Sequence, residues 1–199
     1  MQAEKLIIFV KAPRPGEVKT RLAKALGPEL AAAAYRQLVE KLLTELDSLK
    51  AVELRFSPDE AQNEIQPWLK PDWQLQPQGP GDLGARLRRA FAQSFAAGVQ
   101  RVVIIGSDCP AVTRQHVAAS WTVLEQQDMV LGPARDGGYW LVGLRAPHPA
   151  IFENIRWSTA TVLPETLARA RRAHLSVRLL GELNDVDTGR DWREYLAGK

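Results

Sequence analysis

The sequence predicts an α/β protein with three layers (α/β/α), in which helices cover both faces of a mostly parallel mixed sheet. Strand-like and helix-like segments alternate along most of the 199 residues, as they do in parallel sheets with crossover helices. Val102–Ile105 is a run of four β-branched residues, which is typical of a strand buried on both faces. Asp136-Gly137-Gly138 is a turn signal before an apolar run, so one antiparallel element is expected in the sheet.

The composition is that of a globular chain, with 45% hydrophobic and 25% charged residues. Residues 1–199 are expected to form one domain with a sizeable core. The net charge of +3 is too small to indicate nucleic-acid binding. The single cysteine, Cys109, excludes an internal disulfide and is compatible with a reducing compartment. No signal peptide and no apolar run long enough to span a membrane is visible, so a cytoplasmic protein is expected.

In the first half of the chain, apolar runs bounded by proline or glycine place the elements. Strands are expected at residues 6–10, 51–57 and 73–75, and helices at residues 19–27, 28–46 and 65–69. Pro28 suits the first turn of its helix, where the missing N–H is not needed. Five residues at helical spacing form the expected core-facing stripe of that helix: Leu30, Ala34, Leu38, Leu42 and Leu46.

In the second half, a glycine-rich loop at residues 78–84 opens a helix. Its buried side is expected to contain Leu83, Leu87, Ala90, Phe91 and Phe95. Thr113 is the expected N-cap of a helix that ends near Gln126. Further strands are expected at residues 129–131, 139–144 and 175–180, and further helices at residues 161–174 and 189–196.

Asp108 stands at the carboxyl end of the buried strand, which is the edge where open α/β sheets bind ligands. A carboxylate there is costly without a partner, and a cation such as Mg²⁺ or Mn²⁺ is one candidate. A cap of the following turn explains Asp108 equally well. Asp185 and Asp187 follow the last expected strand and are candidates for a second carboxylate, although Asp187 or Thr188 would also suit as the cap of the last helix.

A basic loop follows the first strand. Its cations and turn residues are Lys11, Arg14, Gly16, Lys19, Thr20 and Arg21. Such a loop before a helix N-terminus suits phosphate, because free N–H groups and the helix dipole add to the side-chain charges. It is not a Walker A loop, because Glu17 and Val18 separate Gly16 from Lys19. An ordinary solvated surface loop fits these residues equally well.

Two further loops combine glycine with a carboxylate. Residues 132–140 place Asp136 and two glycines beside two aromatic side chains, which leaves room for a flat or sugar-like ligand, but a plain hairpin turn also explains them. Residues 78–86 offer backbone N–H groups and Asp82, which would also serve as an N-cap. Cys109 and the three histidines lack the supporting residues of a catalytic site, so structural roles are expected for them.

Several motifs in a fixed order carry a resemblance to a known family. They run from Lys11 to Leu22, Gln78 to Arg86, Gly106 to Pro110, Gly132 to Leu144, Trp157 to Thr159 and Asp185 to Thr188. The chain resembles the bacterial GT-A-type proteins regarded as glycosyltransferases, a family whose function has long been unassigned. It is similar, more distantly, to the guanylyltransferases of phospholactate and molybdenum-cofactor assembly. The resemblance implies a nucleotide-diphospho-sugar transferase fold.

The resemblance also implies roles for these motifs. Nucleotide-binding residues would be Lys11, Ala12, Pro13, Lys19, Thr20 and Arg21 toward the phosphates, and Gly81, Asp82 and Gly84 toward the base or ribose. Asp108 would bind the divalent cation, with Asp187 or Asp185 as the second carboxylate. Acceptor-binding residues would be Gly137, Gly138 and Tyr139. Catalytic roles would fall to Asp108, Lys19 and Asp136.

The expected function is transfer from a nucleotide-activated small-molecule donor to an unknown acceptor, dependent on Mg²⁺ or Mn²⁺. Glycosyl transfer from a nucleotide sugar is the first expectation. GT-A glycosyltransferases commonly carry Asp-x-Asp, whereas Ser107 and Cys109 flank a single aspartate here. Nucleotidyl transfer, which releases pyrophosphate from a nucleoside triphosphate, therefore stays open, as does nucleotide binding without catalysis. A monomer and a homodimer are both compatible with the sequence.

Overall fold

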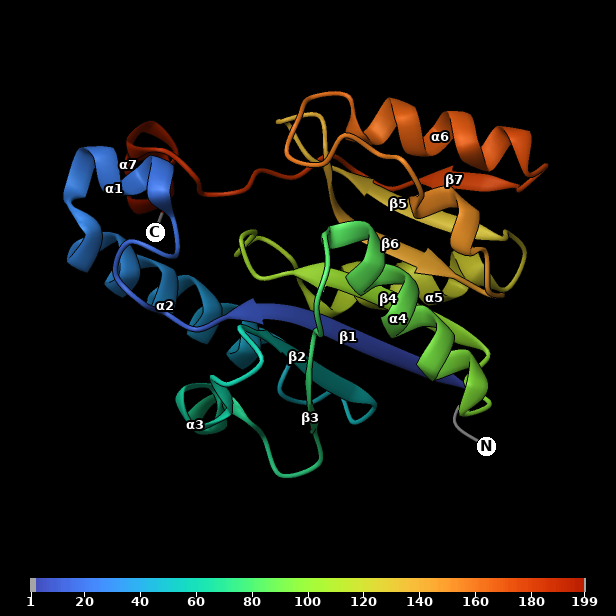
Figure 1. The fold of residues 1–199 in the computed structure, drawn as a ribbon, viewed down its shortest axis with the longest axis horizontal. Coiled ribbons are helices and arrows are strands. Elements are labelled where there is room, and N and C mark those ends of the chain that lie inside the picture. The colour runs from blue at the N-terminus through green and yellow to red at the C-terminus, as the bar shows by residue number, and fades with distance from the viewer. Residues whose placement is uncertain (1–2, 199) are drawn as a thin grey trace.

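The computed structural model describes residues 3–198, and within them seven strands form one sheet in the order β3-β2-β1-β4-β6-β5-β7 (Figure 1). The strands are β1 (Glu4–Lys11), β2 (Val52–Ser57), β3 (Gln74–Pro77), β4 (Arg101–Gly106), β5 (Met129–Pro133), β6 (Tyr139–Leu144) and β7 (Val177–Leu179). β6 runs antiparallel to β4 and β5, and the other strand pairs are parallel. The predicted mostly parallel mixed sheet is confirmed.

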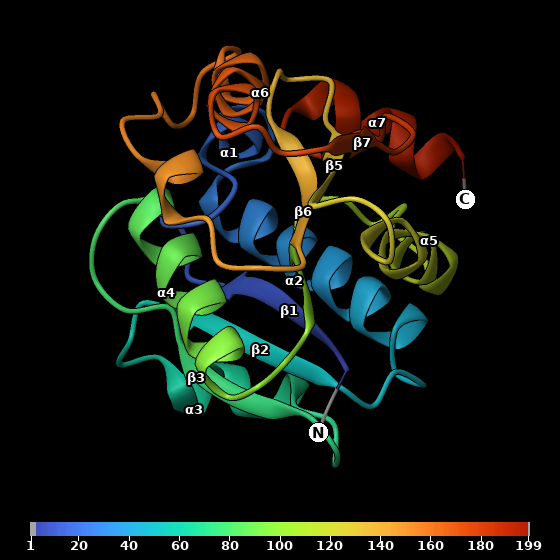
Figure 2. The ribbon, with the colours of Figure 1, turned by 90° about the vertical axis from the view of Figure 1, so that its right-hand side faces the viewer.

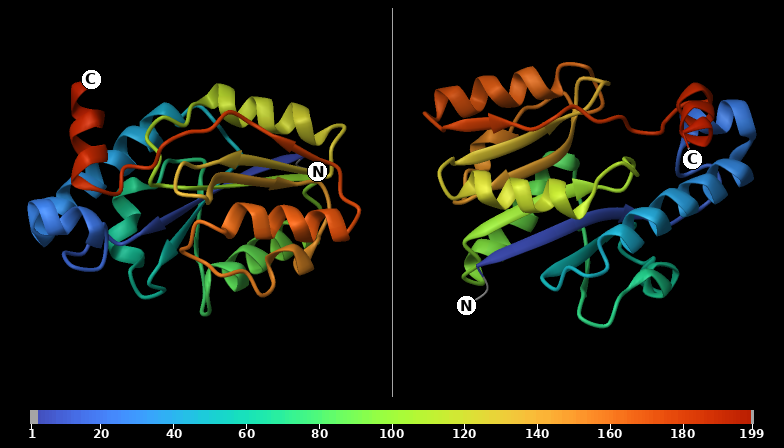
Figure 3. Two further views of the ribbon diagram at one scale, coloured as in Figure 1. Left: turned by 90° about the horizontal axis from the view of Figure 1, so that it is seen from above. Right: turned by 180° about the vertical axis from the view of Figure 1, so that it is seen from behind.

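Helices cover both faces of this sheet, as Figures 2 and 3 show. The helical elements are α1 (Thr20–Leu26), α2 (Pro28–Glu45), α3 (Gln62–Ile65), η1 (Gln66–Trp68), α4 (Leu83–Ala96), α5 (Arg114–Leu124), η2 (Pro149–Phe152), α6 (Val162–Arg172) and α7 (Gly189–Ala197). α2, α3 and α5 contribute to the core on one face, and α4 and α6 to the core on the other. The predicted three-layer architecture is confirmed. Across residues 3–198, no helix is both long and apolar enough to cross a membrane.

β1 shows why the sheet is covered on both sides. Leu6, Ile8 and Val10 pack into the core beneath α2, whereas Ile7 and Phe9 pack into the core beneath α4. Side chains alternate between the faces of a strand, so a run without polar residues needs an apolar layer on each face.

Two leucines that the sequence pattern assigned to buried stripes are exposed, and these assignments were wrong. Leu30 is 62% exposed and Leu83 is 41% exposed. Each lies in the first turn of its helix, before the helix reaches its core, and burial begins at Ala31 in α2 and at Gly84 in α4. A 3.6-residue period identifies a face of a helix but not where that face meets its neighbour.

The chain leaves β1 and β4 in opposite directions. In the strand order, α1 and α2 lead from β1 outward to β2, whereas α5 leads from β4 outward in the opposite direction, toward β5. The carboxyl ends of the two adjacent strands therefore part, and open α/β sheets bind ligands at such a switch point. α1 and α7 lie together beyond this edge (Figure 1).

Candidate active site

Three segments that are far apart in the sequence meet at the parted ends of β1 and β4. They are the loop before α1 (12–19), the turn after β4 (107–110) and the loop before α7 (184–188). The Val186 N–H donates a 3.0 Å hydrogen bond to the Asp108 carbonyl oxygen. Lys19 Nζ lies 2.6 Å from Asp108 Oδ1 and 2.9 Å from Asp187 Oδ1. The prediction that these three side chains gather at one sheet edge is confirmed.

Lys19 is the cation at the centre of this cluster, and its side chain is 2% exposed. It is the N-cap of α1 with a φ of 49° and a ψ of 42°, a left-handed conformation that strains a residue with a side chain. Burial alone would lower the pKa of Lys19, but the carboxylates of Asp108 and Asp187 outweigh burial and raise it. Lys19 therefore stays charged, and two charge-assisted contacts offset the strain.

Asp185 lies beside the same cluster without a partner. Within the described residues, its carboxylate makes no hydrogen bond and no ion pair. Burial raises the pKa of this carboxyl to about 7, and three neighbouring carboxylates add to the shift: those of Asp108, Asp187 and Asp136. Burial and the charge of Asp185 also raise the pKa of the Cys109 thiol to about 12. The region therefore holds an excess of negative charge.

The other cations of the basic loop face different partners. Arg21 forms an ion pair with Asp187. Arg14 pairs instead with Glu60 at 3.1 Å and with Glu64 of α3 at 2.6 Å. Arg14 therefore fastens the loop to α3, whereas Arg21 remains at the sheet edge.

The remaining residues of the predicted phosphate loop differ in exposure. Lys11 and Thr20 are exposed, and Pro13 is half-buried. Ala12 is buried, and its N–H donates to the Ser57 carbonyl oxygen at 2.8 Å. Their contacts with a nucleotide stay predictions.

Gln78 supports the glycine-rich loop before α4. Its Nε2 donates to two backbone carbonyl oxygens at 3.0 Å, those of Val10 and Arg55. Asp82 accepts a 2.8 Å hydrogen bond from the Ala85 N–H, which confirms the N-cap interpretation. The loop is thus fixed at both ends, next to the carboxyl ends of β1 and β2.

Glycine suits positions 81 and 84 of this loop for different structural reasons. Gly81 has a φ of 99°, which glycine adopts without strain. A Cβ built on Gly84 would lie 2.5 Å from the Phe152 carbonyl oxygen and 2.9 Å from Trp157 Nε1. Gly84 thus allows α4 to approach η2, a packing role that the sequence reasoning missed. Nucleotide contacts at both glycines stay predictions.

The turn before β6 is a hairpin turn, as one of the two interpretations predicted. Asp136 Oδ1 accepts a 2.9 Å hydrogen bond from the Gly138 N–H, and Gly137 has a φ of 87°. The Tyr139 hydroxyl is buried beside Thr166 of α6, and burial raises its pKa. Any contact of Tyr139 with an acceptor would therefore not involve an exposed hydroxyl.

Tyr35 and Ser107 join the two parted strand ends, and the sequence reasoning missed both. The Tyr35 hydroxyl lies 2.8 Å from Ser107 Oγ and accepts a 2.8 Å hydrogen bond from the Lys11 N–H. The available signal was a tyrosine within the alanine-rich and leucine-rich buried side of α2. A periodicity argument assigns such a residue to the core and leaves its hydroxyl unexplained.

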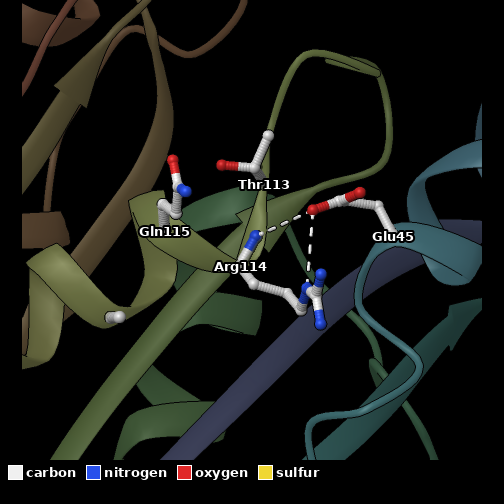
Figure 4. A pocket seen from close by; sticks show the side chains of 5 residues that line it. Glu45, Thr113, Arg114 and Gln115 are labelled. Carbon is white, nitrogen blue, oxygen red and sulfur yellow. Dashed lines mark hydrogen bonds and ion pairs between the residues drawn. The ribbon is translucent and has the colours of Figure 1, made fainter.

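Two surface hollows of about 440 and 610 Å³ lie between the last turns of α2 and the start of α5. Figure 4 shows Glu45 facing Arg114 across the first of them, with Glu45 Oε1 at 3.4 Å from the Arg114 backbone nitrogen and 3.7 Å from its Nε. Among the described residues that line the two hollows, none is a predicted site residue. The second hollow reaches Pro110, the last residue of the turn that carries Asp108, but no carboxylate of the cluster lines either hollow.

The donor set of the cluster fits a hard divalent cation. Carboxylate oxygens are the protein ligands that Mg²⁺ and Mn²⁺ prefer, and within residues 3–198 Asp185 makes no hydrogen bond and no ion pair. Over residues 3–198, no group of three or more His, Cys, Asp and Glu side chains is arranged to hold a metal ion. Phosphate oxygens and water would thus complete the coordination of an ion held by Asp108 and Asp187. The metal site stays a prediction.

Comparison with curated proteins identifies relatives with one shared name. The chain is 29% identical over 196 residues to the phosphoenolpyruvate guanylyltransferase of Sphaerobacter thermophilus, an alignment that covers 96% of this chain and 92% of the relative. The phosphoenolpyruvate guanylyltransferase of Chloroflexus aggregans is 36% identical over 72 residues, which is 36% of each protein. This second alignment thus spans about a third of its relative.

Solved structures share the fold of this chain, and a family model matches more than half of its sequence. A crystal structure from Desulfovibrio desulfuricans G20, assigned provisionally as a nucleotide-diphospho-sugar transferase, matches with a TM-score of 0.92 and 37% identity over 98% of this chain and 87% of that one. CMP:2-keto-3-deoxy-manno-octonic acid synthetase, solved with CTP, shares the fold with a TM-score of 0.60 and 10% identity over 98% of both chains. Residues 38–159 match the model of DUF2064, described as an uncharacterized protein conserved in bacteria. The chain therefore belongs to the DUF2064 family, within the nucleotide-diphospho-sugar transferase-like superfamily.

Proposed function

We propose that this protein is a metal-dependent transferase that acts on a nucleotide-activated donor, and that its reaction is nucleotidyl transfer to a phosphorylated small molecule. The observation that carries the proposal is Lys19, which lies between Asp108 and Asp187 at the switch point of the sheet. The full-length similarity to a phosphoenolpyruvate guanylyltransferase supports the reaction class.

The side chains at this edge have the charges that such a reaction requires. An oxygen of the acceptor phosphate would attack the α-phosphorus, the bond from that phosphorus to the bridging oxygen would break, and pyrophosphate would leave. The attacking oxygen is already ionised, so no general base is needed. Lys19 and Arg21 would offset the charge that develops on the departing pyrophosphate. A divalent cation held by Asp108 and Asp187 would supply further charge neutralisation at the phosphates.

Glycosyl transfer is the second candidate, and the provisional assignment of the Desulfovibrio relative favours it. The donor would then be a nucleotide sugar, the attack would fall on the anomeric carbon, and a nucleoside diphosphate would leave. The turn after β4 holds the single aspartate Asp108, and the other carboxylates of the cluster come from the Asp185-Val186-Asp187 loop far along the chain. The full-length similarity to a phosphoenolpyruvate guanylyltransferase is the reason for placing nucleotidyl transfer first.

One assay separates the two reactions. The purified protein is incubated with each nucleoside triphosphate and phosphoenolpyruvate, and separately with nucleotide sugars and phosphorylated or hydroxylated acceptors, in Mg²⁺, in Mn²⁺ and in a chelator. Pyrophosphate release that requires GTP, an acceptor and a metal ion supports nucleotidyl transfer. Release of a nucleoside diphosphate from nucleotide sugars alone supports glycosyl transfer and contradicts the first proposal.

Replacing Asp108 tests the site. Asp108→Asn is expected to lower metal-dependent turnover by roughly two to three orders of magnitude, the usual loss when one group that stabilises transition-state charge is removed. The matched control is Asp72→Asn, because Asp72 is an exposed aspartate in the turn before β3. Metal-dependent turnover that survives in Asp108→Asn would show that the site lies elsewhere.

A further inference from the structure

Tyr35 lies where β4 separates from β1. The β1–β4 ladder ends at the pair Phe9 and Gly106, whereas β1 continues beside β2 as far as Lys11. The next N–H along β1, that of Ala12, faces β2. Alternate N–H groups of a strand point to opposite neighbours, so the Lys11 N–H points to the side that β4 has left.

The hydroxyl of Tyr35 takes the place of the missing strand. It accepts the Lys11 N–H at 2.8 Å and shares a 2.8 Å hydrogen bond with Ser107 Oγ. Tyr35 is 2% exposed and Ser107 is 3% exposed, so water does not compete for these bonds. The ring packs edge-on against Trp68 at 6.4 Å between centroids, which fixes where the hydroxyl lies.

Both partners of this hydroxyl lead directly into the candidate site. Lys11 ends β1, directly before the loop that ends in Lys19, and Ser107 precedes Asp108 in the chain. The buried hydroxyl oxygen of Tyr35 thus links the strand that leads into the loop before α1 (12–19) to the turn after β4 (107–110). Burial, together with the charge of Asp108, raises the pKa of Tyr35, so the hydroxyl stays neutral and does not act as a base.

We propose that Tyr35 is a positioning residue, which sets the distance between the loop that carries Lys19 and the turn that carries Asp108. The proposal rests on the proposed function, because it assigns to these two segments the donor phosphates and the cation. Tyr35 itself would not touch the substrate. Transition-state stabilisation depends on geometry within fractions of an ångström. Loss of the two hydrogen bonds of the Tyr35 hydroxyl should therefore lower kcat more than it weakens substrate binding.

The test compares Tyr35→Phe with Ser120→Ala. Tyr35→Phe removes one oxygen and keeps the ring, whereas Ser120→Ala removes a buried hydroxyl in the same helical layer that bonds only within its own helix, to the Val117 carbonyl oxygen at 2.6 Å. Tyr35→Phe is expected to lower kcat at least tenfold with KM within about threefold of wild type. Ser120→Ala is expected to keep kcat within twofold. Hydrogen exchange should accelerate at residues 11–20 and 106–110 in Tyr35→Phe alone.

Each outcome decides the proposal. A Tyr35→Phe protein with wild-type kcat overturns the positioning role and leaves the proposed function standing. A wild-type protein without turnover in any donor and acceptor pair overturns the proposed function, and the positioning role with it. If Tyr35→Phe does not fold, Ser107→Ala removes one of the two bonds and should show a smaller fall in kcat with the same KM. Unchanged kcat in Ser107→Ala would then contradict the proposal.

Discussion

At the scale of single residues, the candidate site is a place of unbalanced charge and strained backbone. Lys19 adopts a left-handed conformation, and Asp185 is a half-buried carboxylate that makes no hydrogen bond and no ion pair with the described part of the chain. Each feature costs stability, and neither is needed to form the sheet. Backbone strain and unpaired buried charge cluster at functional sites, which supports a functional role for this sheet edge.

The raised pKa of Asp185 predicts how stability depends on pH. The pKa is about 7 in the folded chain against 3.8 for an unperturbed aspartate, so the unfolded state releases its proton first as pH rises. The contribution of Asp185 to stability should therefore fall between about pH 4 and pH 7 and level off above. Asp185→Asn removes this penalty and should raise Tm at pH 8 by about 4–8 °C, the shift that roughly 2 kcal/mol gives in a chain of this size.

The measurement is thermal unfolding in a chelator at pH 4.5 and at pH 8, with Asp72→Asn as the control. The gain in Asp185→Asn should be much smaller at pH 4.5, where the wild-type carboxyl is protonated in the folded state. An equal gain in Tm at pH 4.5 and at pH 8 would contradict the raised pKa of Asp185. If a bound cation offsets the charge of Asp185, added Mg²⁺ should narrow the difference in Tm between wild type and Asp185→Asn at pH 8.

At the scale of elements, a local sequence pattern predicted the secondary structure correctly where a single property of the residues determines it. The four β-branched residues of β4 and the N-cap residues Thr113 and Asp82 formed what their chemistry predicts. The pattern of β2 indicated a strand but not the burial of the charges within it. Glu53 is 3% exposed because it pairs with Lys5 of the neighbouring strand at 2.7 Å. A pairing of this kind depends on strand order, which no local pattern contains.

Gly84 illustrates the same limit and supplies a prediction. The family resemblance implies a nucleotide contact at Gly84, which stays a prediction. No local pattern indicated that the missing side chain also leaves room for Phe152 and Trp157. Gly84→Ala gains helix propensity of up to about 1 kcal/mol, but the added Cβ would lie 2.5 Å from a backbone oxygen. Overpacking should outweigh the gain, with a net loss of about 1–2 kcal/mol.

Urea unfolding measures this loss, and Gly181→Ala is the matched control. A Cβ on Gly181 meets no atom within 4 Å, so that substitution should be neutral or slightly stabilising. A stabilised Gly84→Ala protein would show that η2 and Trp157 move aside at little cost. The packing role of Gly84 would then be wrong.

At the scale of the whole molecule, the candidate site joins a loop from early in the sequence to a loop from late in the sequence. Lys19 and Asp187 are 168 residues apart and lie 2.9 Å from one another through Nζ and Oδ1. The sequence indicated that both belong at the carboxyl edge of the sheet, because each follows a predicted strand. It did not indicate that α7 would lie beside α1, where Trp192 packs against the small core around Leu22 (Figure 1).

Loss of Lys19 should therefore destabilise the loop that leads to α7. Lys19→Met leaves Asp108 without its cation and Asp187 with Arg21 alone. The repulsion between the two carboxylates should then favour local opening of this loop. The Val186 N–H, bonded to the Asp108 carbonyl oxygen at 3.0 Å, reports on that opening. Its hydrogen exchange should accelerate at least tenfold, which corresponds to about 1.4 kcal/mol. Lys24→Met, an exposed substitution on the same helix, should leave the rate unchanged. Unchanged protection of Val186 in Lys19→Met would mean that α7 is held by its contacts with α1 alone.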